Sequence, residues 1–273
     1  MVGTLAQIIA LTAYGNDFLI NGNIPHDFDS SNTTLQFCNR VDFREFRKMF
    51  LSSKPKERVV SSSPIEWFEY LRVGGCKHLR LYCKSSNDES FAEDRKLAGF
   101  VGGGGVWRIE AIYDDYSNYW ASRWEVTDQN AADRKVWTVN YFMLSERQPT
   151  RNLQIDNQLV KSKLAHTLSE ITDFALRLNL HNWAEQFEKS SAVLDSVSPE
   201  DSYYHKDLIP LDNYSLTAKQ ILFSAGSAWV FGGMGSWNDL RFENKKDSDT
   251  YERLSEQLYS MINEAIIAGT NAY

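Results

Sequence analysis

The segments VWRIEAIYD (106–114), WASRWEVT (120–127) and VWTVNYFML (136–144) decide the fold. Each alternates large apolar residues with polar ones, the period of two expected of a half-buried β-strand. The two connections between them are short and rich in turn residues. Because consecutive strands joined by short loops pair with each other, the stretch predicts an antiparallel meander.

The alternation gives this meander two different faces. The first face collects aromatic and aliphatic side chains, namely Trp107, Ile109, Ala111, Tyr113, Trp120, Ser122, Trp124, Val126, Trp137, Val139, Tyr141 and Met143. The second face carries charges that can pair across strands, namely Arg108, Glu110, Arg123 and Glu125. An aromatic face either stacks a flat ligand or packs beneath helices, and we favour packing because the chain has several amphipathic helices. We expect Trp120 and Tyr119, which lie near a loop, to escape this core.

Two further units precede the meander. Residues 5–13 (LAQIIALTA) indicate a buried strand or a short helix that is closed by Gly15 and Asn16. Residues 63–83 indicate a helix, a Gly-Gly turn and a strand. Ser63 suits the N-cap of this helix, and Glu66 can complete a capping box with it.

The pattern becomes helical beyond Pro149. Asp156 is a plausible N-cap, residues 179–182 weaken the helix that follows, and Ser215 caps another. A last helix is expected after Ser248, with Gly269 as its C-cap.

The fold class is therefore α+β: an antiparallel, aromatic-rich β-meander with packed helices, followed by a mainly helical C-terminal region. We divide the chain into a β-rich region (1–150) and a helical region (151–273). No long linker separates these regions, so they can pack as one domain.

Charge and composition exclude several classes of protein. The 273 residues are 42% hydrophobic, which is too apolar for a disordered chain. Lysine and arginine number 29 against 36 acidic residues, and this net charge of −7 disfavours a nucleic-acid binder, which needs a basic face. Most of the acidity lies in residues 151–273, which hold 11 basic and 17 acidic side chains.

Cysteine usage and hydropathy bear on location. The three cysteines, Cys38, Cys76 and Cys83, cannot form a disulfide framework, and we interpret them as reduced thiols rather than metal ligands. The N-terminal stretch lacks the basic segment and cleavage site of a signal peptide, and no run of 18 apolar residues occurs. We expect a cytoplasmic protein without a membrane segment.

Catalytic motifs are absent from the sequence. The run Gly102–Gly105 precedes a strand, whereas a phosphate-binding loop follows one, and no GxGxxG, GxSxG or HExxH pattern occurs. Glu110, Asp239 and His205 are the candidate catalytic side chains, but nothing in their spacing links them. We expect neither a metal nor a cofactor.

The segment WVFGGMGSWND (229–239) is the densest local peculiarity. Glycines among aromatic residues imply a tight backbone path, and the segment either packs as structure or forms a binding loop. With Trp120 from the sheet, the candidate ligand- or partner-binding residues are Trp229, Met234, Ser236, Trp237 and Asn238.

Two functions follow as hypotheses. The first is a non-enzymatic interaction or assembly component of a cytoplasmic, bacterial system, acting through a protein partner or self-association. The alternative is an enzyme or receptor for a small aromatic, nucleotide-like or sugar-like ligand, bound between the 106–144 sheet and the 229–239 loop. Convergence of Glu110, Asp239 and His205 in one cavity would favour the alternative.

Overall fold

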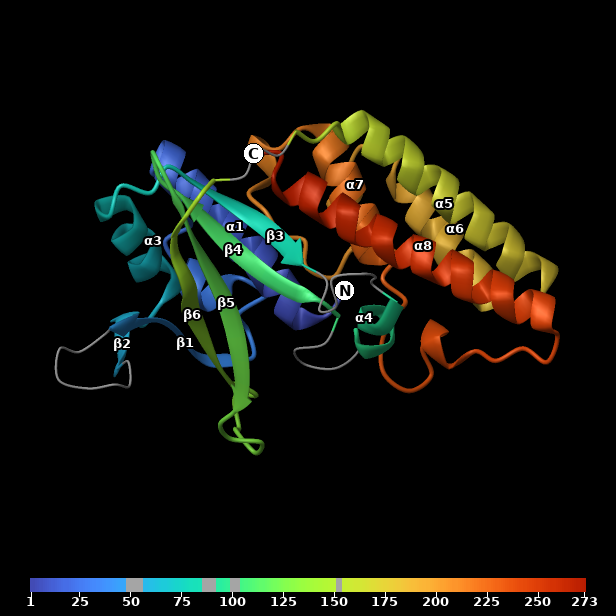
Figure 1. The fold of residues 1–273 in the computed structure, drawn as a ribbon, viewed down its shortest axis with the longest axis horizontal. Helices are drawn as coiled ribbons and strands as arrows, with labels where there is room; N and C mark the ends of the chain where they lie inside the picture. Colours follow the sequence, from blue (N-terminus) through green and yellow to red (C-terminus); the bar gives the residue numbers. More distant parts are fainter. Residues whose placement is uncertain (48–55, 85–91, 99–103, 151–153) are drawn as a thin grey trace.

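A computed structural model describes residues 1–47, 56–84, 92–98, 104–150 and 154–273 (Figure 1). A twisted sheet with helices behind it forms one end of the molecule, and long packed helices form the other. The α-helices of the described chain are α1 (Gly3–Asn21), α2 (Phe28–Ser31), α3 (Pro64–Val73), α4 (Ala92–Leu97), α5 (Asn157–Arg177), α6 (His181–Val193), α7 (Leu216–Ser227) and α8 (Lys245–Thr270). The strands are β1 (Cys38–Arg47), β2 (Lys56–Ser61), β3 (His78–Lys84), β4 (Val106–Ile112), β5 (Ser117–Val126) and β6 (Trp137–Gln148). The α+β class is thus confirmed.

The six strands of the described residues form one sheet in the order β2-β1-β6-β5-β4-β3. The predicted meander is present, because β4 pairs antiparallel with β5 and β5 pairs antiparallel with β6. The sheet as a whole is mixed, since β1 runs parallel to β6. A parallel neighbour needs a crossover connection, and here the connection contains α3, which covers one face.

Much of the aromatic face of the meander is core, as favoured above, although Trp107 and Trp124 are only partly buried and Val126 is 46% exposed. Ile109 lies opposite Trp120, and Trp120 lies opposite Met143, so the predicted set shares one side of the sheet. Phe43 of β1 joins this side and stacks on Trp67 of α3, with ring centroids 4.3 Å apart. The expectation that Trp120 and Tyr119 escape the core is wrong: Trp120 is 1% exposed and Tyr119 is 6% exposed.

The charged face forms different ion pairs from those expected within the meander. Glu110 is fully buried and pairs with Arg80 of β3, whose Nη2 lies 2.7 Å from a carboxylate oxygen. Arg123 pairs with Glu125 two residues along its own strand, at 3.0 Å. Strand β3, which the meander does not include, therefore supplies the partner of Glu110.

Residues 5–13 belong to a single long helix rather than a strand. Helix α1 continues through Gly15 and Asn16, which were expected to close the segment, and ends at Gly22 in the left-handed region (φ 70°). A Cβ atom at Gly15 would lie 2.4 Å from Leu79 Cδ1. Gly15 therefore serves close packing of the helix on β3 and does not end the helix.

Two asparagine side chains complete the outer edge of β3. Asn16 of α1 accepts a hydrogen bond from the Leu79 N–H at 2.6 Å and donates one to the Leu79 carbonyl at 2.8 Å. Asn271, just after α8, makes the same pair of bonds with Leu81 at 2.7 and 2.9 Å. An edge strand normally exposes such groups to further pairing, so these amides stand in for a seventh strand.

The capping box predicted for α3 is formed in part: the bond to the Ser63 side chain is present, but the Glu66 carboxylate accepts from Ser62 and not from the N-cap Ser63. The Glu66 N–H donates to Ser63 Oγ at 3.3 Å, and the Ser62 N–H donates to the Glu66 carboxylate at 2.9 Å. The Glu66 N–H is a donor that a helix start would otherwise leave unpaired, whereas the Ser62 N–H lies one residue before the N-cap.

We therefore expect Ser63→Ala to lower the free energy of unfolding by about 1 kcal/mol, because the N–H of Glu66 loses its acceptor. Urea denaturation followed by circular dichroism measures this change. Ser62→Ala is the matched control, since Ser62 contributes only its backbone N–H to the box. Equal stability of the two variants would contradict the assignment.

The helical region follows the predicted pattern with two corrections. Asp156 caps α5, the chain breaks between α5 and α6 at Asn179 (φ 57°), and Ser215 caps α7. Helix α8 begins at Lys245, earlier than expected, because Asn244 caps it. Gly269 lies inside α8 and is not its C-cap: a Cβ atom there would lie 2.7 Å from Leu222 Cβ, so this glycine lets α7 approach α8.

No helix among the described residues combines the length and apolar character needed to cross a membrane. One continuous cluster of buried apolar residues runs through both ends of the molecule.

Candidate functional site

The candidate site is a cleft through the sheet where β4 and β5 separate. Their last pair is Ile109 with Trp120. Beyond it both strands continue, β4 to Val106 alongside β3 and β5 to Val126 alongside β6. Residues 106–108 and 121–123 therefore flank a gap and make no strand pairing with each other.

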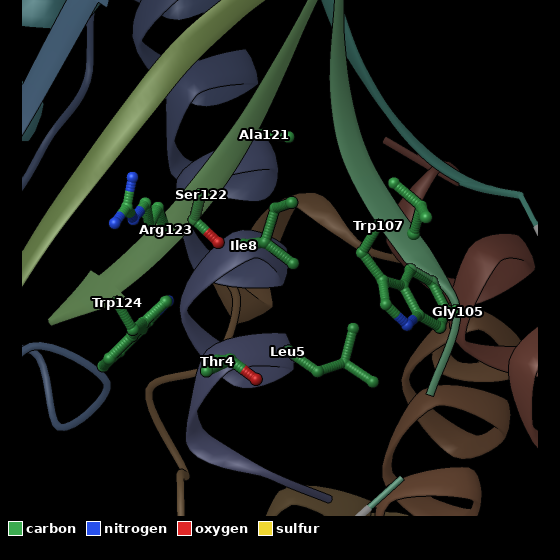
Figure 2. A pocket seen from close by; sticks show the side chains of 10 residues that line it. Thr4, Leu5, Ile8, Gly105, Trp107, Ala121, Ser122, Arg123 and Trp124 are labelled. Carbon is green, nitrogen blue, oxygen red and sulfur yellow. The ribbon is translucent and has the colours of Figure 1, made fainter. Parts of the chain in front are cut away.

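Helix α1 forms the floor of this cleft, and two tryptophans stand on its sides. Figure 2 shows Trp107 of β4 on one side, Trp124 of β5 on the other, and Leu5 and Ile8 of α1 between them. The cavity has a volume of about 260 Å³. Its polar lining comes from Thr4, Ser122 and Arg123.

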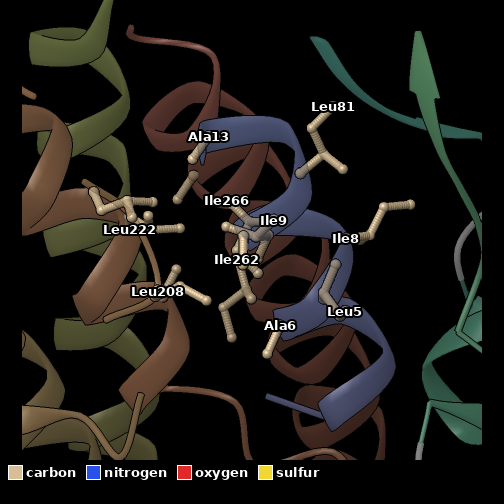
Figure 3. Close-up of a cluster of buried hydrophobic side chains, with 14 of the residues drawn as sticks. Leu5, Ala6, Ile8, Ile9, Ala13, Leu81, Leu208, Leu222, Ile262 and Ile266 are labelled. Atoms are coloured by element: carbon tan, nitrogen blue, oxygen red, sulfur yellow. The ribbon is translucent and has the colours of Figure 1, made fainter. Parts of the chain in front are cut away.

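The floor is held in place from behind. The side of α1 that carries Ala6, Ile9 and Ala13 packs against apolar residues of the helical region, including Leu222 and Ile262 (Figure 3). A helix buried on both sides cannot shift without disturbing two packing layers, so the cleft has a preformed apolar base.

Arginines provide the positive charge around the cleft. Arg123 is largely exposed at its mouth and shares one contact with Glu125. Arg108 follows Trp107 on β4, and it lines a neighbouring depression of about 430 Å³ together with Tyr82, Lys84 and Tyr119. Its Nε is buried and has no hydrogen-bond partner in the described part of the chain. A guanidinium binds anions through charge-assisted hydrogen bonds, and this Nε–H is one donor that an anion can use.

The three candidate catalytic residues do not converge. Glu110 lies on β4, where Arg80 and the Tyr119 hydroxyl occupy both of its carboxylate oxygens. The carboxylate of Asp239 accepts a hydrogen bond from the Gly235 N–H and so holds its own loop. His205 contacts the hydroxyl of Thr33, which lies between α2 and β1. None of the three hydrogen-bonds with another, so they form no acid–base set.

The 229–239 segment is mainly part of the helical core. Trp237 is fully buried against Phe174, Trp183, Phe187 and Tyr251, and its indole N–H donates to Ser255 Oγ at 2.7 Å. Ser236 caps the short helix η3 (Trp237–Asp239). These two residues are thus structural.

The remaining loop residues differ in exposure. Trp229 is half-buried and donates its indole N–H to the Phe231 carbonyl at 2.8 Å. Asn238 accepts a hydrogen bond from Arg95 of α4 at 2.9 Å. Met234 is fully exposed at the tip between glycines. The segment contributes no residue to the cleft, which is lined by α1, Gly105, β4 and β5.

His205 belongs to a polar contact between the two regions. Its Nδ1 lies 2.8 Å from the Thr33 hydroxyl, which also contacts the carboxylate of Asp207. A carboxylate only accepts, so the hydroxyl donates to Asp207 and the imidazole donates through Nδ1–H. Burial lowers the pKa of His205, although Asp207 opposes this effect. We interpret His205, Thr33 and Asp207 as a structural contact that holds the two regions together, and we call it the latch.

The latch predicts a pH dependence of stability. Because the folded pKa of His205 is lowered, the unfolded chain binds the proton first, and stability is full above about pH 6.5 and falls below it. His205→Asn keeps a donor near Thr33, and we expect its stability to decline less steeply between pH 7 and pH 5.

Urea titrations at several pH values measure this slope. Burial also lowers the pKa of His78, so part of the slope remains in the variant. His166→Asn, at an exposed histidine on α5, is the matched control for the substitution itself. A His205→Asn slope equal to the parent's would contradict the role given to burial.

Sequence reasoning missed the cleft. Trp107 and Trp124 were assigned to the core face, and Arg108 and Arg123 to cross-strand pairing. The signal that could have raised attention is the pair Ala121–Ser122, small residues between the tryptophans of β5. Gly105, at the lip, has φ 91°, while Gly102 and Gly103 lie outside the described residues.

In comparisons with protein-family models, curated proteins and solved structures, nothing matches this chain. In the part of the chain that the structure describes, no three histidine, cysteine, aspartate or glutamate side chains gather as metal ligands.

Proposed function

We propose that the protein is a non-enzymatic interaction component that docks a protein partner at the cleft between β4 and β5. The observation that carries the proposal is the separation of two strands that are each still paired on their far side. Facing backbone rows without a strand partner attract another chain. Leu5 and Ile8 of the floor are 2% and 1% exposed, so the partly buried Trp107 and Trp124 offer most of the apolar contact, and tryptophan is enriched among residues that dominate binding energy at protein interfaces.

The chemistry of the cleft supports recognition rather than catalysis. Its lining combines apolar contact, a hydroxyl pair and one arginine, without a base positioned beside a nucleophile. All three cysteines are free, and Cys38 and Cys76 are buried, which suits a reducing compartment. We therefore place the proposed interaction in the cytoplasm.

A photo-crosslinking amino acid at Ala121, which lines the cleft, tests this proposal in the cells that make the protein. We expect a discrete adduct with one protein, which mass spectrometry identifies and purified components reconstitute. The same group at Glu188, exposed on α6, is the control. Trp124→Ala should abolish the reconstituted binding, whereas Trp229→Ala should preserve it. Equal adducts at both positions would refute docking at the cleft, and an adduct with a second copy would indicate self-association.

The second candidate is a receptor for a small flat ligand. The observation in its favour is the pair Trp107 and Trp124, since indole rings stack sugars and bases. The volume of about 260 Å³ is below the range of roughly 300–1,000 Å³ typical of drug-sized ligands, so a monosaccharide or a nucleobase is the fitting size. Thermal-shift measurements with nucleosides and monosaccharides test this candidate: a rise in Tm that Trp124→Ala removes would favour it over a protein partner.

A further inference from the structure

The two sides of the cleft are strand segments that do not pair with each other. Residues 106–108 of β4 are engaged by β3 on one side only, and residues 121–123 of β5 are engaged by β6 on one side only. Backbone N–H and C=O groups require partners, and an extended chain supplies them in the correct spacing. Because β4 and β5 are antiparallel, such a chain would run parallel to one and antiparallel to the other.

The surroundings of the gap differ on the two faces of the sheet. Toward the inside lie Leu5 and Ile8 of α1, between the two tryptophans. Toward the outside lies Arg108, which belongs to the face of Glu110. Successive side chains of a strand point to opposite faces. An inserted chain would therefore meet apolar surface with one residue and a guanidinium with the next.

The charge at the outer face selects the complementary residue. Arg108 makes no hydrogen bond or ion pair in the described part of the chain, and its buried Nε lacks a partner. Arg123 contacts Glu125, and within the described residues its other donors have no ion-pair partner. Carboxylates bind guanidinium groups through charge-assisted, often bidentate hydrogen bonds. The outward residues of the partner are thus expected to be acidic.

We infer that the partner enters the cleft as an extended segment of alternating apolar and acidic residues, added as a strand between β4 and β5. This inference rests on the proposed function and specifies its partner. The apolar side chain lies between Trp107 and Trp124, above the buried Leu5 and Ile8, and the carboxylate pairs with Arg108. The cleft of about 260 Å³ takes the inward side chains of a short segment only.

A display library of random seven-residue peptides, selected on the full chain, tests the inference. We expect enrichment of alternating apolar and acidic residues. The best sequence is then synthesised with blocked ends, and its affinity is measured by isothermal titration calorimetry. Trp124→Ala and Arg108→Gln should each weaken binding at least tenfold, and Trp229→Ala should leave it unchanged.

Two modified peptides separate strand addition from other modes of docking. N-methylation of alternate peptide nitrogens removes backbone donors, and we expect at least a tenfold loss at one set of alternate positions. Replacing the acidic residues by glutamine should remove the effect of Arg108→Gln. The inference is overturned if no peptide binds, if lysine is enriched as often as acidic residues, or if N-methylation is harmless throughout. If the inference fails but a crosslinked partner still depends on Trp124 for binding, the proposed function stands. If no partner crosslinks at Ala121, both the inference and the proposed function are wrong.

Discussion

Trp237→Ala is expected to lower the free energy of unfolding by about 3–5 kcal/mol, the cost of removing a large aromatic side chain from a close-packed core. The indole is fully buried, and three of its neighbours, Phe174, Trp183 and Phe187, approach it edge-on with ring centroids 5.1–6.5 Å away. The substitution also leaves Ser255 Oγ without the N–H that it accepts at 2.7 Å. A cavity and an orphaned acceptor both favour the unfolded state.

Chemical denaturation measures this loss. The control is Met234→Ala on the same segment, whose side chain is fully exposed and whose removal should change stability by less than about 0.5 kcal/mol. A Trp237→Ala protein as stable as the parent would show that the aromatic cluster is looser than described. The experiment also separates a structural role of this segment from a binding role. Substitution of a residue used mainly for partner binding would weaken that binding and leave the stability of the protein unchanged.

Asn16→Ala is expected to lower the free energy of unfolding by about 2–4 kcal/mol, because it leaves two buried backbone groups of Leu79 without partners. Asn16 is itself fully buried, so the loss is not made good by bulk water. Beyond stability, the variant reopens part of the edge of β3, and we expect it to aggregate more readily on heating.

Denaturation and light scattering measure the two effects. Asn182→Ala, an exposed asparagine on α6, is the matched control and should behave like the parent. Asn271→Ala removes the two hydrogen bonds to Leu81. We expect a smaller loss of stability than for Asn16→Ala, because these bonds are only partly buried. Unchanged stability of Asn16→Ala would mean that the edge of β3 does not need these amides.

The asparagine bonds to β3 and the cleft between β4 and β5 both concern strand backbone that has no neighbouring strand. At the edge of β3, Asn16 and Asn271 satisfy the backbone from within the chain. Between β4 and β5, the facing rows are left to a partner in our proposal. The asparagine bonds limit strand addition at β3, while β2 forms the opposite edge of the sheet.

Local patterns in the sequence determined a large part of the fold. The period of two between 106 and 144 correctly assigned the faces of the meander, because the side chains of a strand alternate whatever it packs against. Ser63, Asp156 and Ser215 were recognised as N-caps because capping depends on residues within one turn.

Tertiary structure decided the features that depend on residues distant in sequence. Gly15 and Gly269 were predicted to end their segments, yet each lies inside a helix. Each is a glycine because another element approaches too closely for a Cβ atom. Trp237 looked like a binding residue, but four rings from other segments bury it. The cleft also depends on distant residues: alternation continues along β4 and β5 past Ile109 and Trp120, where β4 stays paired with β3 and β5 with β6 but not with each other. Local chemistry thus determined which residues form each helix and strand. Long-range packing determined where strand backbone is left unpaired, and therefore where the candidate site lies.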